Sequence, residues 1–237
     1  MSNPLDAARG RPLAVVLISG GMDSVVALAM SLKEGFEPAG LHLNYGQKTE
    51  KREERAFQQI CDFYGIRRRM VVPLPYFKQI GGSSLTDEKI PVTTSGIDPT
   101  VIPSSYVPFR NAHALSIATS WAEVLGASRI VIGAVEEDSS GYPDCREIFY
   151  KAFEKAIYLG TKPESKIEIA VPVIHFSKAE IVRKGSELGV PFHLTWSCYQ
   201  NEDVACGVCD SCRLRLKGFA QAGIEDPIPY KEKEIYA

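Results

Sequence analysis

A short segment near the N-terminus has residue types that could hold a phosphate group. The residues SGGMDS at positions 19–24 follow an apolar run, Leu13–Ile18, and precede a helical pattern that continues to Lys33. Two glycines let the backbone turn tightly and approach an anion, and the free N–H groups and dipole of a following helix point toward it. We therefore expect a buried strand, a phosphate-binding turn and a helix, in that order.

This turn differs from the P-loop of kinases and GTPases. A P-loop has a lysine directly before its Ser or Thr, at a fixed distance from its first glycine, and residues 19–24 have neither feature. We therefore do not expect transfer of a γ-phosphoryl group. The alternative, a tight turn without a ligand, is less consistent with a serine, two glycines, Asp23 and Ser24 occurring together.

Four of the six cysteines lie close together near the C-terminus. Cys198, Cys206, Cys209 and Cys212 have the spacing C-x7-C-x2-C-x2-C. Two-residue gaps allow successive thiolates to face one ion, and four thiolates complete the tetrahedral coordination of a structural zinc ion, which would stabilise the fold. The run C-x2-C-x2-C also occurs around four-iron clusters. Zinc is the favoured interpretation, with the iron cluster as its competitor.

Three further polar strings indicate where a substrate would bind. They are NYGQ at residues 44–47, YVPFRN at 106–111 and SGYPDCR at 140–146. Arg110 and Asn111, at the start of a predicted helix, could bind an anion or the polar edge of a ring. The third string follows a predicted strand and combines an aromatic ring, a carboxylate and a guanidinium group. All three are expected at the same edge of the sheet.

The composition is consistent with one α/β domain. Of 237 residues, 45% are hydrophobic, and the formal net charge of −2 is spread without long runs of one sign. A full core can form, and no surface for nucleic acid is indicated. No run approaches the roughly eighteen apolar residues of a membrane span, and residues 1–11 lack the apolar core of a signal peptide. We therefore expect a cytoplasmic protein that binds neither membrane nor nucleic acid.

Apolar runs that alternate with helical patterns define the fold class. Short strands are predicted at residues 13–18, 38–43, 69–72, 129–133 and 167–171, and helices at 23–33, 50–64, 111–125, 146–159, 177–188 and 212–222. This order predicts an α/β fold with a doubly wound, mostly parallel sheet and helices on both faces. Ligands of such sheets bind beyond the carboxyl ends of the strands.

Domain organisation is expected to be simple. We predict a single domain over residues 1–237, with a zinc-binding subregion at 196–222. The stretch 73–108 is rich in Gly, Pro, Ser and Thr and has little periodicity. A connection of that length in a compact domain is typical of a lid or binding loop, with a tolerated insertion as the alternative.

The turn at residues 19–24 resembles the pyrophosphate-binding loop of the ATP pyrophosphatases, also called adenine nucleotide alpha hydrolases. That resemblance implies ATP cleavage between the α and β phosphates, with adenylation of a substrate oxygen. The wider set SGGMDS, YGQ, VPFRN, SGYPDCR, TWSCY and the four cysteines, from about residue 13 to about residue 220, resembles the 7-cyano-7-deazaguanine synthase family of queuosine biosynthesis. Two positions depart from the family pattern, Met22 and Phe109, and Phe109 could reshape the purine pocket.

The resemblance implies an ATP-dependent carbon–nitrogen ligase. Its substrates would be 7-carboxy-7-deazaguanine and ammonia, and its product the nitrile 7-cyano-7-deazaguanine, formed through an adenylated carboxylate and an adenylated amide with release of AMP and pyrophosphate. It also implies ATP, Mg²⁺ and Zn²⁺ as cofactors and a homodimer. Whether the product would enter queuosine, archaeosine or DNA modification is left open, because the chemistry is shared.

The expected site residues form three groups. ATP is expected on Ile18, Ser19, Gly20, Gly21, Met22, Asp23, Ser24, Val25, Val26, Ala27 and Leu28. The deazaguanine is expected on Tyr45, Gln47, Arg110, Asn111, Glu136, Asp138, Tyr142, Asp144 and Arg146. The catalytic group is Asp23, Ser24, Arg110 and Lys178. Asp23 would be a magnesium or water partner, and Lys178 would neutralise phosphate charge unless it is a solvent-facing helix lysine.

Alternative functions remain at this point. A tRNA-modifying adenylating enzyme of the thiolation or lysidine type is disfavoured by the acidic net charge and by the lack of a long additional domain. A non-catalytic nucleotide-binding module with a zinc knuckle is disfavoured by the intact turn and the SGYPDCR string. Cys145 as a nucleophile is disfavoured because adenylation already activates the substrate. The four histidines lack ligand spacing and are interpreted as structural.

Overall fold

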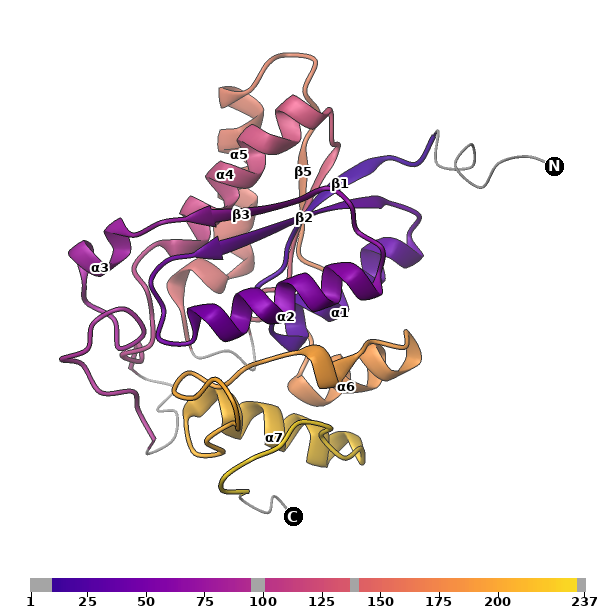
Figure 1. Cartoon of the computed structure of the whole chain (residues 1–237). Coiled ribbons are helices and arrows are strands. Elements are labelled where there is room, and N and C mark those ends of the chain that lie inside the picture. The colour runs from indigo at the N-terminus through magenta and orange to yellow at the C-terminus, as the bar shows by residue number, and fades with distance from the viewer. Residues whose placement is uncertain (1–9, 95–100, 137–140, 234–237) are drawn as a thin grey trace.

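The computed structural model describes residues 10–94, 101–136 and 141–233, and in these ranges the chain forms a five-stranded sheet with helices on both faces (Figure 1). The strands are β1 (Leu13–Leu17), β2 (Glu37–Asn44), β3 (Arg69–Pro73), β4 (Arg129–Ile132) and β5 (Glu168–Ala170). Their spatial order is β3-β2-β1-β4-β5, and every pair of neighbours is parallel. The predicted α/β fold with a parallel sheet is confirmed.

Helices cover the two faces of the sheet. The long helices are α1 (Met22–Lys33), α2 (Glu50–Phe63), α4 (Arg110–Leu125), α5 (Glu147–Gly160), α6 (Lys178–Glu187) and α7 (Asp210–Ala222). α1 and α2 lie on one face and α4 and α5 on the other, while α6 and α7 form a further layer outside α1 and α2 (Figure 1). Two short 3-10 helices, η1 (Pro143–Cys145) and η2 (Phe192–Leu194), lie in connections.

The side chains of β1 alternate between two hydrophobic cores. Ala14 and Val16 belong to the core under α1 and α2, which continues to α6 and α7, whereas Val15 and Leu17 belong to the core under α4 and α5. Successive side chains of a strand point to opposite faces. A strand covered on both faces can therefore be apolar at every position, as the LAVVL sequence of β1 is.

The connection from β3 to α4 packs against the carboxyl ends of β2 and β3. It contains a short helix that the sequence did not predict, α3 (Tyr76–Ile80). A small separate core holds it in place, made of Tyr45, Leu74, Phe77, Leu85 and Val107. The described parts of the predicted binding loop are therefore anchored to the sheet by their own apolar contacts.

The strand order changes direction next to β1. From β1 the chain moves outward through β2 to β3, and it then returns to place β4 and β5 on the other side of β1. Helix crossovers therefore leave on opposite faces, and a crevice opens at the carboxyl ends of β1 and β4. The segments that follow β1, β2 and β4 all begin at this crevice.

The C-terminal segment folds back over the cysteine region. Ala205 pairs with Tyr230 in an isolated parallel bridge, and a Cβ at Gly207 would lie only 1.6 Å from the carbonyl oxygen of Glu232. Position 207 therefore has room only for glycine. Among the helices of the described ranges, none combines the length and the apolar character that crossing a membrane requires.

Candidate active site

The turn after β1 has the geometry of a phosphate-binding loop. Gly20 has φ +90°, and a Cβ there would lie 3.0 Å from the carbonyl oxygen of Glu53, so this position requires glycine. Gly21 caps the N-terminus of α1 without a side-chain hydrogen bond. The free N–H groups of the first turn of α1 therefore point out of the carboxyl edge of the sheet, where they can bind an anion.

The two serines of the turn bond to each other. Ser19 Oγ donates to Ser24 Oγ at 3.2 Å, and Ser24 Oγ donates to the carbonyl oxygen of Gly21 at 2.8 Å. These bonds fix the turn and keep both hydroxyl groups at its mouth. Across the crevice, the residue after β4, Gly133, lies close to the start of the same helix. A Cβ at Gly133 would be only 2.6 Å from the backbone of Asp23.

Lys178 lies opposite the turn, at the first position of α6. Ser177 and Glu180 form a capping box that starts this helix and so fixes the position of Lys178. Lys178 Nζ is 2.7 Å from Asp23 Oδ2, and the lysine side chain is 9% exposed. The alternative of a solvent-facing lysine is therefore wrong. The second carboxylate oxygen, Asp23 Oδ1, is buried and has no hydrogen-bond partner among the described residues.

A single cavity runs from the turn to the polar strings. It encloses about 1380 Å³ of empty space, counting its open mouth. Of the expected site residues, those that line it are Ile18, Ser19, Gly21, Met22, Asp23, Ser24, Tyr45, Arg110, Asn111, Tyr142 and Lys178. The expected phosphate end and the expected substrate end are therefore parts of one site.

The remaining expected residues that the structure describes are not in the cavity lining. Gly20 forms the turn itself, and Val25, Val26, Ala27 and Leu28 are fully buried in the core beneath it. Gln47, Glu136, Asp144 and Arg146 are not part of the lining. Asp138 lies outside the described residues. The apolar side chains of α1 therefore support the turn from below, and a role of these four positions in ATP binding stays a prediction.

Arg110 stands at the substrate end, at the start of α4. Its Nη1 donates to the hydroxyl oxygen of Tyr45 at 2.9 Å, and its guanidinium lies 5.1 Å from the centre of that ring. Burial raises the pKa of the Tyr45 hydroxyl. Tyr45 therefore stays protonated and holds the guanidinium without neutralising it. The positive charge of Arg110 remains available to an anionic ligand.

Asn111 and Asp144 bind each other. The backbone N–H of Asn111 donates to Asp144 Oδ2 at 2.9 Å, and the Asn111 side chain donates to the carbonyl oxygen of Asp144 at 3.0 Å. The carboxylate thus caps the N-terminus of α4 and places the neighbouring Arg110. In this arrangement both residues position the site, and one carboxylate oxygen of Asp144, Oδ2, is already engaged by the protein.

Three other expected residues also have hydrogen-bond partners within the protein. Tyr142 donates its hydroxyl to Ser105 Oγ at 2.9 Å and lines the cavity with its ring. Glu136 accepts the backbone N–H of Glu147 at 2.9 Å and so helps to start α5. Arg146 is exposed and donates to the carbonyl oxygen of Pro143. Tyr142 therefore belongs to the site, whereas Glu136 and Arg146 lie beside it.

Phe109, the residue before Arg110, adopts φ 59°, the only positive φ of a non-glycine residue in the described ranges. Such a conformation is unfavourable for a bulky residue. The Phe109 ring is 55% exposed and contacts the rings of His113 and Phe149. Phe109 is not among the residues that line the cavity.

Cys145 lines the cavity but is not activated. Burial raises the pKa of its thiol to about 11. Asn111 Nδ2 lies 3.4 Å from the sulfur. A thiol with so high a pKa carries almost no thiolate near neutral pH, and the thiolate is the nucleophile. The structure therefore gives no support to Cys145 as a nucleophile.

The four cysteines near the C-terminus form a cluster that could hold a metal ion. Cys198, Cys206, Cys209 and Cys212 are all buried, and their sulfur atoms lie within 4.8 Å of one another. Backbone N–H groups of residues 200, 201 and 206 donate to the sulfur of Cys198, as expected for a thiolate acceptor. Cys206 Sγ and Cys212 Sγ are 3.9 Å apart. Thiolates bound to one ion at about 2.3 Å in a tetrahedron would lie about 3.8 Å apart.

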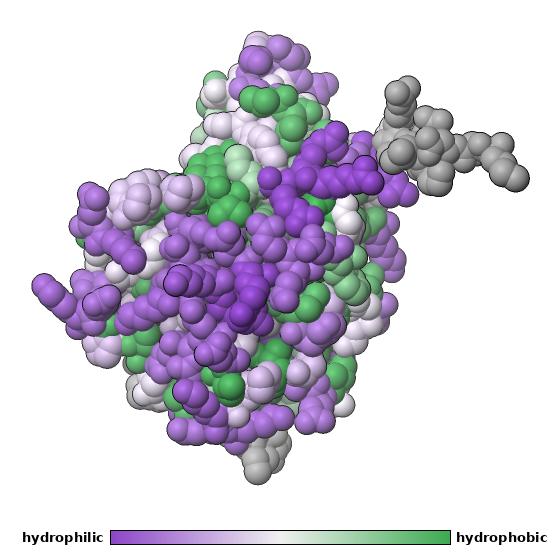
Figure 2. Space-filling model, viewed as in Figure 1, coloured by the Kyte–Doolittle hydropathy of each residue, from purple (hydrophilic) through white to green (hydrophobic). Residues whose placement is uncertain are grey.

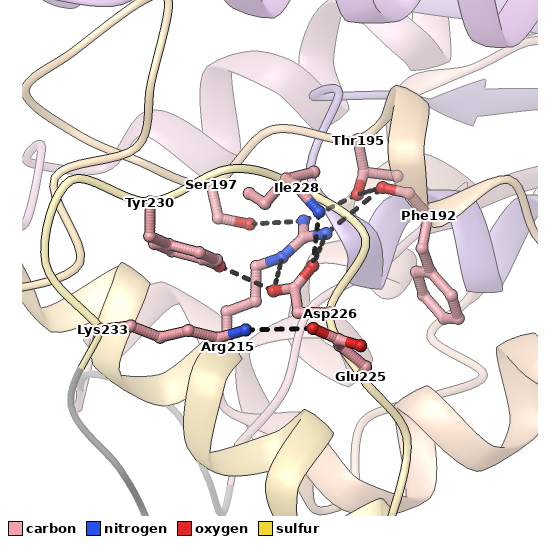
Figure 3. A network of polar contacts seen from close by, with 9 residues as sticks. All are labelled: Phe192, Thr195, Ser197, Arg215, Glu225, Asp226, Ile228, Tyr230 and Lys233. Atoms are coloured by element: carbon pink, nitrogen blue, oxygen red, sulfur yellow. Dashed lines mark hydrogen bonds and ion pairs between the residues drawn. The ribbon is translucent and has the colours of Figure 1, made fainter.

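A buried ion pair anchors the C-terminal segment next to the cavity (Figure 3). Arg215 donates to both oxygens of Asp226, from Nε at 2.7 Å and from Nη2 at 2.9 Å. Arg215 Nη1 also donates to Thr195 Oγ1 at 2.7 Å. Trp196, the next residue, donates its backbone N–H to the carbonyl oxygen of Gly20 at 2.8 Å. A continuous set of hydrogen bonds therefore joins the C-terminal segment to the phosphate-binding turn.

Several residues of the lining were not among the expected ones. They include His42, Glu53, Trp196, Tyr199 and Arg215. Burial raises the pKa of the Glu53 carboxyl to about 7, while hydrogen bonds from Thr49 and Gln47 oppose the shift. In the sequence, Glu53 is one charged residue among many in α2 and carries no distinguishing signal. Trp196 and Tyr199 lie in the TWSCY string, which could have drawn attention to them.

Comparison with known proteins gives a consistent result. A family model described as Queuosine biosynthesis protein QueC matches residues 13–223. The 7-cyano-7-deazaguanine synthase of Chloroherpeton thalassium is 61% identical over 223 residues, which cover 94% of this chain and 99% of that protein. The protein of the same name from Nautilia profundicola is 57% identical over 220 residues, which cover 93% of this chain and 99% of that protein.

Solved structures are more distant. A predicted subunit of tRNA methyltransferase from Methanocaldococcus jannaschii has a TM-score of 0.49 and 18% sequence identity, over 74% of this chain and 75% of that chain.

Proposed function

Because the chain belongs to the QueC family of queuosine biosynthesis proteins, we propose that it is an ATP-dependent ligase that makes 7-cyano-7-deazaguanine from 7-carboxy-7-deazaguanine and ammonia. The observation that carries the proposal is the single cavity. It joins a loop suited to pyrophosphate, around Asp23 and Lys178, to a pocket with a cation and aromatic rings, around Arg110 and Tyr142.

The chemistry requires two activations of the same carbon. The carboxylate oxygen attacks the α-phosphorus of ATP, which gives an acyl adenylate and pyrophosphate. Ammonia then attacks the carbonyl carbon and AMP leaves with the bridging oxygen, which gives the amide and releases a proton. The amide oxygen attacks a second ATP, and loss of AMP and a proton from the adenylated amide gives the nitrile. Positioning and charge stabilisation carry most of such a reaction.

The ATP phosphates would bind to the turn at residues 19–24. The backbone N–H groups of the first turn of α1 would bind phosphate oxygens, with the hydroxyl groups of Ser19 and Ser24 beside them. Lys178 would balance the negative charge that accumulates as pyrophosphate leaves. Its contact with Asp23 keeps the ammonium group at the mouth of the turn.

Asp23 is suited to hold magnesium. Its Oδ1 is a buried oxygen without a partner in the described structure, and carboxylate oxygen is a preferred ligand of Mg²⁺. When bound, the ion would screen the phosphate charge and align the pyrophosphate leaving group. Lys178 holds the other carboxylate oxygen, so that Oδ1 faces one defined direction.

The deazaguanine would occupy the other end of the cavity. Arg110 would bind the substrate carboxylate and bring it to the α-phosphorus, and the rings of Tyr45 and Tyr142 would contact the heterocycle. Asn111 and Asp144 would act by positioning Arg110 at the start of α4, and Gln47 by its hydrogen bond to Glu53. Glu136 and Arg146 would lie at the edge of the site, in the segment after β4.

The cysteine cluster is proposed to hold structural zinc. The sulfur–sulfur distances fit four ligands around one ion, whereas the thiolates of a four-iron cluster bind four separate iron atoms and stand further apart. A closed site of four thiolates leaves no position for a substrate. The ion would hold Cys198, close to Trp196, against the start of α7, and so would support the wall of the cavity.

We place the enzyme in the cytoplasm as a homodimer that acts on small molecules and does not bind nucleic acid. Reducing conditions there keep thiols free for a metal ion. Dimer formation is supported by large apolar residues exposed on α4 and α5, among them Val124, Ile148, Tyr158 and Leu159. At the top of the view in Figure 2, where α4 and α5 project in Figure 1, apolar surface is visible among polar residues.

An assay of products tests the proposed function. Protein with ATP, Mg²⁺, an ammonium salt and 7-carboxy-7-deazaguanine should form the nitrile, with two AMP and two pyrophosphate molecules for each nitrile by the balance above. Omission of ammonium should stop nitrile formation. Release of ADP instead of AMP, or a requirement for added tRNA, would contradict the proposal.

A further inference from the structure

Glu53 is a carboxylate in the cavity to which the proposed reaction gives no role. It lies in the first turn of α2, which packs directly against the phosphate-binding turn, because a Cβ at Gly20 would be 3.0 Å from the carbonyl oxygen of Glu53. Glu53 is partly buried and is one of the residues that line the cavity. A partly accessible carboxylate in a cavity lining is placed to meet a ligand.

Two neighbours hold the carboxylate in one orientation. Thr49 Oγ1 donates to Glu53 Oε1 at 2.6 Å, and Gln47 Nε2 donates to Glu53 Oε2 at 3.0 Å. Both donors are themselves buried. A carboxylate oxygen can accept about two hydrogen bonds. Each oxygen therefore has its direction fixed and retains capacity for one more donor.

The cavity carries opposite charges on different elements. Arg110, from α4, and Glu53, from α2, both line the cavity. Arg110 also donates a hydrogen bond of 2.9 Å to the hydroxyl oxygen of Tyr45. A 7-carboxy-7-deazaguanine molecule carries the reverse pattern. Its carboxylate is an anion, and its pyrimidine edge presents two parallel donors, the ring N1–H and the 2-amino group. The two ends of this molecule match the two charges.

We propose that Glu53 accepts the N1–H and 2-amino groups of the deazaguanine and thereby selects a guanine-like ring. The inference rests on the proposed function. Two parallel N–H groups on one carboxylate form a bidentate contact, which is both strong and geometrically specific. The other carboxylate in the described lining, Asp23, is paired with Lys178. Among the described residues, Glu53 is thus the acceptor best placed for this edge.

Ligand binding and ionisation of this carboxyl are linked. Removal from water raises the pKa of Glu53 to about 7. A ligand that donates two hydrogen bonds favours the ionised form. An adenine-like edge, which presents an acceptor at N1, would instead face a carboxylate that repels it. The residue therefore both attracts the correct ring and excludes the wrong one.

Substrate analogues with a Glu53→Gln variant test this inference. The wild type should bind 7-carboxy-7-deazaguanine about 10- to 100-fold more tightly than the analogue that lacks the 2-amino group, as expected for loss of one hydrogen bond to a charged acceptor. In Glu53→Gln this ratio should fall to a few-fold, mainly through weaker binding of the natural ring. The KM for ATP should stay within about twofold of the wild type. Glu54→Gln, which makes the same charge change on the next residue of α2, should keep the wild-type ratio.

Three results would overturn the inference. They are an unchanged ratio in Glu53→Gln, an equal loss for both rings together with a raised KM for ATP, and a fall in kcat with unchanged binding of the natural ring. If Glu53→Gln does not fold, Glu53→Asp serves instead. The shorter side chain keeps the negative charge but moves the carboxylate away from the N1–H and 2-amino groups of the ligand. A wild type that forms no nitrile would contradict the proposed function itself, whereas an active wild type with an unchanged ratio in the variant contradicts only the role of Glu53.

Discussion

Lys178 Nζ lies 2.7 Å from Asp23 Oδ2, although the two residues are far apart in the chain. Asp23 belongs to the first turn of α1 and Lys178 to the first turn of α6. The pair leaves Asp23 Oδ1 buried and without a partner in the described residues. One carboxylate oxygen is therefore held by the protein, and the other is left for a ligand that the described residues do not supply.

Replacement of Asp23 should stop turnover without disturbing the fold. In Asp23→Asn the oxygen that would bind magnesium loses its charge, and we expect kcat to fall about 100-fold or more. Steady-state kinetics measures the fall, and metal analysis should find the zinc content unchanged. Loss of the zinc in this variant would mean that Asp23 supports the structure and not the reaction.

Gly218 offers a test of how accurately Lys178 must be placed. A Cβ at Gly218 would lie 2.6 Å from Lys178 Cβ, so that Gly218→Ala must displace the lysine. We expect a roughly 10- to 100-fold loss of kcat/KM, because small misplacements of catalytic groups have effects of this size. Gly160→Ala is the matched control, since nothing lies within 4 Å of its Cβ. Equal activity of both variants would show that the position of Lys178 is not critical.

Removal of the metal ion should destabilise the C-terminal region. Cys209 lies at the start of α7, and Cys209→Ser leaves three thiolates for the ion. We expect loss of bound zinc and a fall in the free energy of unfolding on the order of several kcal/mol. Urea denaturation with metal analysis measures both.

The same experiment on the wild type has an internal control. Chelation should lower the unfolding midpoint, and added zinc should restore it. A purified protein with a broad brown absorbance and stoichiometric iron would contradict the assignment of zinc.

The raised pKa of Glu53 predicts how its effect on stability depends on pH. The folded-state pKa of about 7 lies above the usual value of 4.5, so the folded protein holds this proton more strongly than the unfolded chain. The associated stability is complete below about pH 4.5 and is lost as pH rises through about 7. Arg110, Tyr45 and Glu50 are the charged or titratable groups that influence Glu53.

Glu53→Gln has no carboxyl to ionise at this position. Relative to the wild type, the variant should therefore become more stable as pH rises from 5 to 8. Urea denaturation of both proteins at several pH values gives the difference, in which all other groups cancel. If the difference in unfolding free energy between the two proteins does not change with pH, the pKa of Glu53 is not raised in the folded protein.

The sequence predicted the sheet and the phosphate-binding turn well, for a clear physical reason. The run Leu13–Leu17 is apolar at every position, which requires burial on both faces, and the two glycines after it require a special backbone. The four cysteines were equally informative, because their spacing already limits the geometry of a site. Such features act locally along the chain.

Other parts of the site depend on contacts between distant segments. Nothing near Glu53 in the sequence separates it from the other acidic residues of α2, because the groups that share the cavity with it come from distant segments of the chain. Asp144 looked like a ligand residue in the SGYPDCR string, but it caps the helix that begins at Arg110. The short helix α3 depends on its contact with Leu85 and Val107, which the local pattern does not show.

An isotope experiment tests the central claim, that the substrate oxygens are adenylated in this cavity. The substrate is 7-carboxy-7-deazaguanine with ¹⁸O in both carboxylate oxygens, incubated with unlabelled ATP, Mg²⁺ and ammonium in unlabelled water. Mass spectrometry of the products should find one ¹⁸O atom in each AMP and none in pyrophosphate, because each carboxylate oxygen leaves on an α-phosphate. Label in pyrophosphate, or AMP without label while the nitrile accumulates, would contradict the account.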